Sequence, residues 1–182
     1  MTIFAAAHPL LAEALAKRGF STITDVQSAV LADSCNNQDL LVSAQTGSGK
    51  TVAFGLSMAA QLLGPDAEND FPSQPAALII TPTRELALQV KTELDWLYAE
   101  AGLVLASAVG GMDIRTERRA LSGRVDILVG TPGRLVDHLN RNSFDPDNLR
   151  VVVLDEADEM LDMGFREDLE TLLRAHQNSG EH

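Results

Sequence analysis

Short apolar runs alternate with longer amphipathic stretches along this 182-residue chain, as they do in α/β proteins. The run at residues 151–154 is apolar at every position, which indicates a strand buried on both faces. Strands are predicted at residues 39–43, 76–80, 103–109, 125–129 and 149–154. Helices are predicted at residues 8–18, 24–32, 52–63, 83–100, 113–122, 131–141, 155–163 and 166–176. We therefore expect an α/β fold with a mainly parallel sheet and helices on both faces.

The composition fits one globular domain covering residues 1–182, with 45% hydrophobic residues. No apolar run approaches the roughly 20 residues of a membrane helix, so no membrane contact is expected. The first residues have neither a basic start nor a cleavage site, and we expect no signal peptide. Cys35 is the only cysteine, which excludes an intramolecular disulfide. These features favour a reducing compartment, and we expect a cytoplasmic protein.

The formal net charge of −12 argues against a general nucleic-acid binder. The charge is unevenly distributed, because residues 110–141 hold six arginines and four acids. This segment is either a local phosphate-binding face or a solvated surface, and charge alone leaves both interpretations open.

A glycine-rich turn joins the predicted strand at 39–43 to the helix at 52–63. Its residues are Ala44, Gln45, Thr46, Gly47, Ser48, Gly49, Lys50 and Thr51. Glycines let backbone N–H groups converge on a phosphate, and the following helix adds its dipole. Lys50 supplies a charge for the β- and γ-phosphates, and Thr51 a hydroxyl for Mg²⁺. The turn indicates a nucleoside triphosphate site, although Ala44 replaces the usual first glycine; the alternative is an ordinary turn with an exposed lysine.

Three acids, Asp155, Glu156 and Asp158, follow the predicted strand at 149–154. Ligands of open α/β sheets bind beyond the carboxyl ends of the strands, and clustered acids there need a positive partner. We expect Asp155 to hold Mg²⁺, directly or through water, and Glu156 to orient and deprotonate an attacking water. The alternative is a helix start, where acids complement the dipole.

Taken in order, these motifs resemble the N-terminal RecA-like domain of DEAD-box RNA helicases, and the resemblance covers nearly the whole chain. The matching segments are 44–51 (motif I), 82–89 (motif Ia), 110–111 (the glycine pair), 131–134 (motif Ib), 155–158 (Asp-Glu-Ala-Asp) and 163–165. The resemblance implies a RecA-like P-loop fold, ATP or ADP with Mg²⁺ as ligands, and ATP-dependent RNA helicase activity. It also implies that Glu156, Lys50 and Asp155 are the catalytic residues.

Gly19 and Phe20, followed by Gln27, resemble the family's Q motif, which lies within about residues 4–32. The resemblance implies that Gln27 pairs with adenine and that Phe20 packs on the adenine face. Thr24 and Gln27 also have the spacing of a capping box, so Gln27 alternatively closes a helix N-terminus. Phe20 is alternatively a core aromatic. Ile23 and Asp25 depart from the family's pattern at this point.

The resemblance further implies sequence-independent contacts to an RNA backbone from three loops. The residues are Pro82, Thr83, Arg84, Gly110, Gly111, Thr131, Pro132, Gly133 and Arg134. Hydroxyl groups, glycine backbone and guanidinium forks suit phosphates and 2′-hydroxyls. Internal salt bridges are the alternative for Arg84 and Arg134.

The family's Ser-Ala-Thr motif and its second RecA-like domain are expected beyond this sequence. In the family that second domain supplies arginine fingers, which are worth roughly 10³–10⁵-fold in rate. We therefore expect these residues alone to bind nucleotide with negligible turnover and no RNA unwinding.

Two other interpretations of the function stay open. One is a short non-enzymatic module that binds nucleotide or RNA and regulates a helicase, and the other is a DNA helicase or another P-loop hydrolase.

Overall fold

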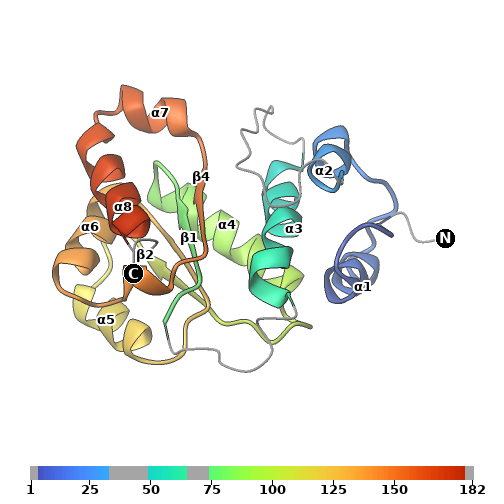
Figure 1. Cartoon of the computed structure of the whole chain (residues 1–182), viewed down its shortest axis with the longest axis horizontal. Helices are drawn as coiled ribbons and strands as arrows, with labels where there is room; N and C mark the ends of the chain where they lie inside the picture. The colour runs from blue at the N-terminus through green and yellow to red at the C-terminus, as the bar shows by residue number, and fades with distance from the viewer. Residues whose placement is uncertain (1–3, 33–48, 65–73, 179–182) are drawn as a thin grey trace. The chain divides into compact units, whose positions relative to one another are not determined.

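The computed structural model describes residues 4–32, 49–64 and 74–178 (Figure 1). They form two compact units, which are described separately. The first unit comprises the described parts of Met1–Glu68 and Glu93–Leu103, and the second those of Asn69–Thr92 and Val104–His182. Helix α4 (Arg84–Leu97) begins in the second unit and ends in the first.

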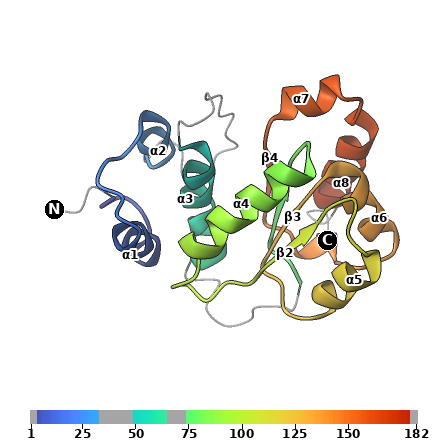
Figure 2. The same cartoon turned by 180° about the vertical axis from the view of Figure 1, so that it is seen from behind.

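The second unit is built on a four-stranded sheet whose described strands are all parallel. The strands are β1 (Ala77–Ile80), β2 (Leu105–Ala108), β3 (Ile127–Gly130) and β4 (Val151–Leu154). They lie in the order β2-β3-β1-β4; β1, β2 and β4 are labelled in Figure 1 and β3 in Figure 2. All residues of the central strands β1 and β3 are buried, which explains their continuous apolar sequences.

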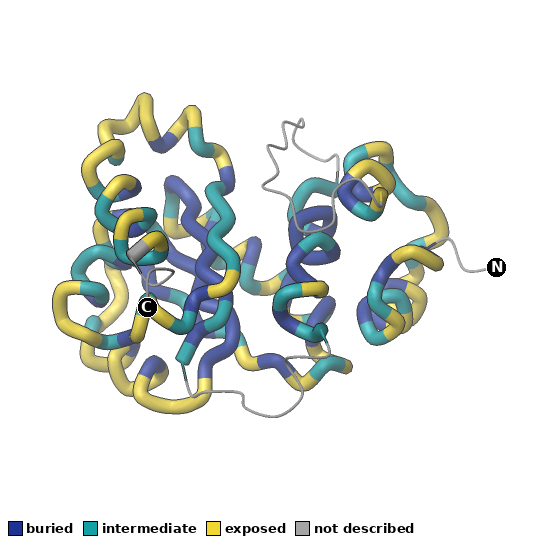
Figure 3. Tube along the Cα trace, in the orientation of Figure 1, coloured by how far each residue is buried: buried dark blue, intermediate teal, exposed yellow. Residues whose placement is uncertain are grey.

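Four further helices belong to the second unit: α5 (Ile114–Ser122), α6 (Pro132–Asn140), α7 (Ala157–Asp162) and α8 (Arg166–Asn178). Their apolar residues form one core with a face of the sheet, and Figure 3 shows the strands as largely buried. This core includes Leu78, Leu128, Leu121, Leu135, Met160 and Leu172. Strand residues Ile79 and Ile127, on the opposite face, are also fully buried, so both faces of the sheet are covered.

The first unit contains α1 (Pro9–Lys17), α2 (Asp25–Val30), α3 (Lys50–Leu63) and the end of α4. Gly55 lets α3 approach α4 closely, because a Cβ there would lie 2.7 Å from Leu97 and 2.9 Å from Leu94. The Tyr98 hydroxyl donates a hydrogen bond to the Gly55 carbonyl. Burial raises the pKa of Tyr98, so this hydroxyl stays protonated as the donor.

The predicted α/β class is confirmed, and most helices and strands lie within a few residues of their predicted bounds. The helix predicted from residue 155 begins only at Ala157, because Glu156 adopts a left-handed conformation. The predicted strand at 39–43 and most of the loop at 64–75 lie outside the described residues. That residues 1–182 form one domain stays a prediction. Within the described ranges, no helix has both the length and the hydropathy to cross a bilayer.

Candidate functional site

Four loops that carry predicted site residues leave the same edge of the sheet in the second unit. Ile80, the last residue of β1, is in register with Gly130 of β3 and Leu154 of β4, and Gly130 is in register with Ala108 of β2. The chain therefore turns away from the sheet at one level, after the carboxyl end of every strand. Ligands of parallel sheets bind at this edge. The structure thus brings together the loops containing residues 82–84, 110–111, 131–134 and 155–156.

The acids follow β4, which is the last strand at one end of the described sheet. Asp155 is 4% exposed, and its backbone N–H donates to the Ile80 carbonyl at 2.9 Å. Glu156 is exposed and has φ 57° and ψ 50° as the N-cap of α7. A residue with a Cβ pays about 1–2 kcal/mol in this left-handed region, which is a cost found often at functional sites. The backbone thus turns sharply between a buried carboxylate and an exposed one.

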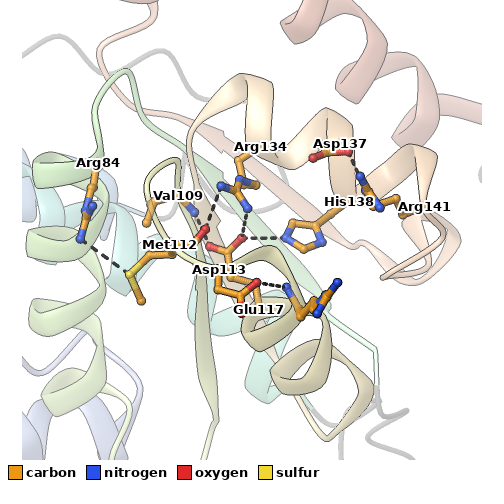
Figure 4. A network of polar contacts seen from close by, with 10 residues as sticks. Arg84, Val109, Met112, Asp113, Glu117, Arg134, Asp137, His138 and Arg141 are labelled. Carbon is orange, nitrogen blue, oxygen red and sulfur yellow. Dashed lines mark hydrogen bonds and ion pairs between the residues drawn. The ribbon is translucent and has the colours of Figure 1, made fainter.

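Arg84 and the glycine pair face each other across two of the loops. Gly111 has φ +85°, and a Cβ built on it would lie 2.6 Å from Nη1 of Arg84, so only glycine fits this turn. The Arg84 Nη2 donates to Met112 Sδ at 3.7 Å, as Figure 4 shows. Thr83 caps the start of α4, where its hydroxyl accepts a hydrogen bond from the Leu86 N–H at 3.2 Å. The described residues offer Arg84 no carboxylate partner, which leaves its charge available to a ligand.

Arg134 makes the internal salt bridge that was the alternative to an RNA contact. Its Nη1 lies 3.1 Å from Glu117 Oε1, and its Nη2 donates to the Met112 carbonyl at 3.0 Å (Figure 4). The Arg134 side chain is 16% exposed, so part of the guanidinium still reaches solvent. Thr131, the N-cap of α6, makes no side-chain capping bond, so its hydroxyl does not cap the helix.

Glu117 and His138 are buried next to Arg134. Neither residue was predicted to belong to the site. Glu117 is 5% exposed; its Oε2 accepts from the Val109 N–H at 2.7 Å, and its Oε1 lies 2.9 Å from His138 Nε2 (Figure 4). One carboxylate therefore ties α5 to the end of β2 and to α6. A signal was present in the sequence, because Glu117 interrupts the apolar stripe of Ile114 and Leu121 at helical spacing.

The predicted Q motif and the end of the phosphate loop lie in the first unit. Thr24 and Gln27 form a full capping box: the Gln27 N–H donates to Thr24 Oγ1 at 3.3 Å, and the Thr24 N–H donates to Gln27 Oε1 at 3.1 Å. The Gln27 Nε2 also donates to the Gly49 carbonyl at 3.3 Å. Each amide atom has the chemical capacity for a second hydrogen bond. Gln27 is 1% exposed in this structure, so its pairing with adenine stays a prediction.

Gly49 starts α3 in a conformation that only glycine adopts here. Its φ is +80°, and a Cβ built on it would collide with Gln27 Nε2 and come within 3.2 Å of Thr24 Cγ2. Among the described residues, no side chain caps this end of α3. Such a helix start fits a phosphate group. The predicted loop residues Ala44, Gln45, Thr46, Gly47 and Ser48 lie outside the described residues.

We expect Gly49→Ala to lower the free energy of unfolding by about 2–3 kcal/mol, from left-handed strain plus the displaced Gln27 amide. Gly19→Ala is the matched control, because Gly19 has φ +83° but nothing lies within 4 Å of its Cβ position. That control should cost only about 1 kcal/mol. Denaturant unfolding of both variants measures the difference, and equal losses would show that the contact with Gln27 has no energetic role.

Thr51, the residue predicted to bind Mg²⁺, is hydrogen-bonded to Glu93 on α4 within the first unit. Burial raises the pKa of Glu93, and the hydrogen bond from Thr51 opposes this shift.

Phe20 packs against Trp96, with ring centroids 5.4 Å apart, and Arg18 lies 5.2 Å from the Trp96 ring centre. Phe20 is only partly buried, so it is not a core aromatic in the strict sense, and its adenine contact stays a prediction.

The fold and the loops at its carboxyl edge define an α/β domain of the RecA-like class. A family model described as DEAD/DEAH box helicase matches residues 24–181, and the chain belongs to this family. The chain is 44% identical over 170 residues to the ATP-dependent RNA helicase RhlB of Serratia proteamaculans, covering 93% of this chain and 40% of that protein. For RhlB of Proteus mirabilis the identity is 41% over 177 residues, covering 97% and 41%. The chain thus spans about two fifths of the length of these curated relatives.

Solved structures show the same fold. The yeast DEAD-box splicing factor Prp28 has a TM-score of 0.86 at 29% identity, covering 97% of this chain and 42% of that one. A DEAD box protein from Methanococcus jannaschii has a TM-score of 0.80 at 36% identity, covering 93% and 45%. These similarities confirm the predicted RecA-like fold and the family resemblance.

Proposed function

We propose that this chain is the ATP-binding part of an ATP-dependent RNA helicase, which couples ATP hydrolysis to the unwinding or remodelling of RNA duplexes. The observation that carries the proposal is the pair Asp155 and Glu156 at the carboxyl end of β4, within a chain that matches the DEAD/DEAH box model. The backbone of Glu156 is held in a costly left-handed conformation, which a plain helix start does not require.

The nucleotide-binding roles in this proposal are the ones that the sequence motifs predict. Lys50 and the N–H groups at the start of α3 bind the phosphates, with Gly49 allowing the close approach. Gln27 pairs with adenine through the second positions of its amide, and Phe20 packs near the base. Thr51 and Asp155 hold Mg²⁺, which neutralises phosphate charge when bound. For Thr51 this role requires its hydroxyl to exchange the Glu93 partner for the metal.

Glu156 takes the proton from the attacking water in this proposal. Its exposure at the edge of the sheet leaves the carboxylate accessible to a water and a phosphate. The burial of Asp155 beside it supports a role in holding the metal rather than in exchanging protons. The two adjacent acids thus have separate tasks, set by their different exposure.

The RNA-binding roles fall on the three loops after β1, β2 and β3. Arg84 supplies a charge for which the described residues offer no carboxylate partner, and Gly111 allows a phosphate to approach the backbone. Arg134 holds Met112 and Glu117 in place and presents the remaining exposed part of its guanidinium. Contacts of this kind read the backbone and the 2′-hydroxyls, so binding is independent of base sequence.

We further propose that the complete protein contains a second RecA-like domain, which closes over the nucleotide and supplies arginines. A polypeptide of these 182 residues alone then binds ATP or ADP with negligible turnover. A cytoplasmic location suits a chain with a single cysteine. The alternative of a non-enzymatic module is less favoured, because binding alone has no need for Glu156.

The test is ATP hydrolysis by the complete protein with single-stranded RNA or DNA of the same sequence. We expect RNA to raise the rate of hydrolysis and DNA to leave it near the basal level, because the predicted contacts include 2′-hydroxyls. Equal stimulation by both would contradict the RNA assignment. Binding of ATP and RNA without any hydrolysis would favour the regulatory module.

A further inference from the structure

Helix α5 carries three exposed arginines on one face. Arg115, Arg118 and Arg119 are spaced at i, i+3 and i+4, so their side chains share one stripe of the helix. Glu117 and Leu121 are buried on the other side. The exposed stripe contains no acid to balance the three positive charges.

Three other helices of this chain carry acid–base ion pairs at the same spacing. Glu13 and Lys17 on α1, Asp137 and Arg141 on α6, and Glu170 and Arg174 on α8 are all acid–base ion pairs at i, i+4. On α5 the i, i+4 positions are both arginine, at 115 and 119. Like charges at this spacing destabilise a helix. Within the described part of the chain, none of the three guanidinium groups is paired with a carboxylate.

The protein has a formal net charge of −12, so the stripe of Arg115, Arg118 and Arg119 is not part of a generally basic surface. A local group of unpaired guanidiniums on an acidic protein suits a polyanion, because each phosphate neutralised releases a counterion. Arginine also binds phosphate oxygens in a bidentate manner.

The stripe is continuous with the proposed RNA-binding loop and is held rigidly against it. Helix α5 begins at Ile114, three residues after Gly111, and the Asp113 carboxylate caps it by accepting from the Arg115 N–H at 3.0 Å. Glu117 fixes the inner face of α5 to Val109 and Arg134 (Figure 4). The outer face is therefore presented in a set direction beside the loop.

We propose that Arg115, Arg118 and Arg119 form a second phosphate-binding surface, which holds the backbone of RNA flanking the segment bound at Gly111 and Arg84. This inference rests on the proposed RNA-binding function. The nine residues of α5 extend roughly 13 Å, which gives the surface room for more than one phosphate. Contacts from this surface add affinity for RNA without base specificity. Only an RNA that extends beyond the segment bound by the loops of Arg84 and Gly111 is long enough to make them.

The test compares R115A/R119A with the control R166A/R174A, which removes the same charge from exposed positions of α8. Binding to single-stranded RNAs of about six and about twelve nucleotides is measured in the complete protein at several KCl concentrations, with Mg²⁺ and a non-hydrolysable ATP analogue. For R115A/R119A we expect about tenfold weaker binding of the longer RNA. The slope of log K against log [KCl] should fall by about 1.4, as for two lost contacts to a single strand. The shorter RNA and the control variant should be unaffected.

Each other outcome is informative. If wild type binds both RNAs and R115A/R119A matches the control on the longer one, the surface on α5 is refuted and the proposed function stands. If R115A/R119A weakens both RNAs equally, the arginines belong to the central contact and the extension is refuted. If wild type binds neither RNA, the proposed function itself fails and the inference fails with it. Unchanged melting temperatures confirm that the variants are folded.

Discussion

Replacing Glu156 with Gln lowers the rate of ATP hydrolysis in the complete protein by about 10²–10⁴-fold and leaves nucleotide binding intact. Gln keeps the size and the hydrogen-bonding reach of Glu but cannot take a proton at neutral pH. The substitution retains a Cβ, so the left-handed backbone at this position carries the same cost in both proteins. The loss therefore reports on proton transfer rather than on folding.

Glu159→Gln is the matched control for this experiment. Glu159 is also exposed and also lies in the first turn of α7, and its substitution changes the net charge equally. We expect its rate of hydrolysis to stay near that of wild type. Steady-state hydrolysis at saturating ATP and RNA measures the rate, and equilibrium binding of ADP measures affinity. If E156Q hydrolyses ATP at the wild-type rate, Glu156 is not the base.

The position of the acids was predictable because it depends on local sequence. The four apolar residues at 151–154 predicted a strand buried on both faces; β4 forms there, but all four residues are only partly buried, since β4 lies at one end of the described sheet. Parallel strands align their carboxyl ends, so Asp155 and Glu156 had to emerge at the ligand-binding edge. The left-handed backbone of Glu156 was not predictable, because position 156 holds a glutamate rather than the glycine or asparagine that usually adopts a positive φ. It shifts the start of α7 to Ala157.

The contacts of Glu117 with Arg134 and His138 depend on tertiary structure, and a single sequence does not specify which residues of different helices come into contact. Arg134 had two candidate roles, and its partner lies 17 positions earlier on another helix. Only the packing of α5 against α6 brings Glu117, Arg134 and His138 together. A buried carboxylate needs such partners, because removing one member of a buried pair costs about 3–5 kcal/mol. The apolar stripe of α5 indicates that position 117 is buried, but it does not say what Glu117 binds.

Gln27 shows how one local motif can serve two purposes. The spacing of Thr24 and Gln27 predicted the capping box, and the structure contains both of its hydrogen bonds. The additional bond from Gln27 to the Gly49 carbonyl joins the starts of α2 and α3. A nucleotide that binds at Gly49 therefore meets a backbone already fixed by Gln27, and pre-organised groups lose less entropy on binding.

Replacing Lys50 with Ala removes most of the thermal stabilisation that ATP or ADP with Mg²⁺ gives to this polypeptide. A ligand at 100 times its dissociation constant stabilises the folded state by about 2.7 kcal/mol, which for a chain of this length raises Tm by about 5–10 °C. Lys50 is the first residue of α3. In the proposed site its charge and the first N–H groups of the helix act on the same phosphates. Without the lysine charge, affinity falls and the same nucleotide concentration no longer saturates the site.

Lys17→Ala is the control for the lost charge, because Lys17 pairs with Glu13 and Glu100 on the surface of the first unit. Those exposed pairs contribute little to stability, so this variant should keep the full nucleotide-induced shift. Thermal melting with and without nucleotide, at 100 times the wild-type dissociation constant, measures both variants. A Lys50→Ala protein whose Tm rises as much as that of wild type would show that the phosphates do not bind at the start of α3. Since Thr51 and Gly49 flank Lys50, their proposed roles would then fail as well.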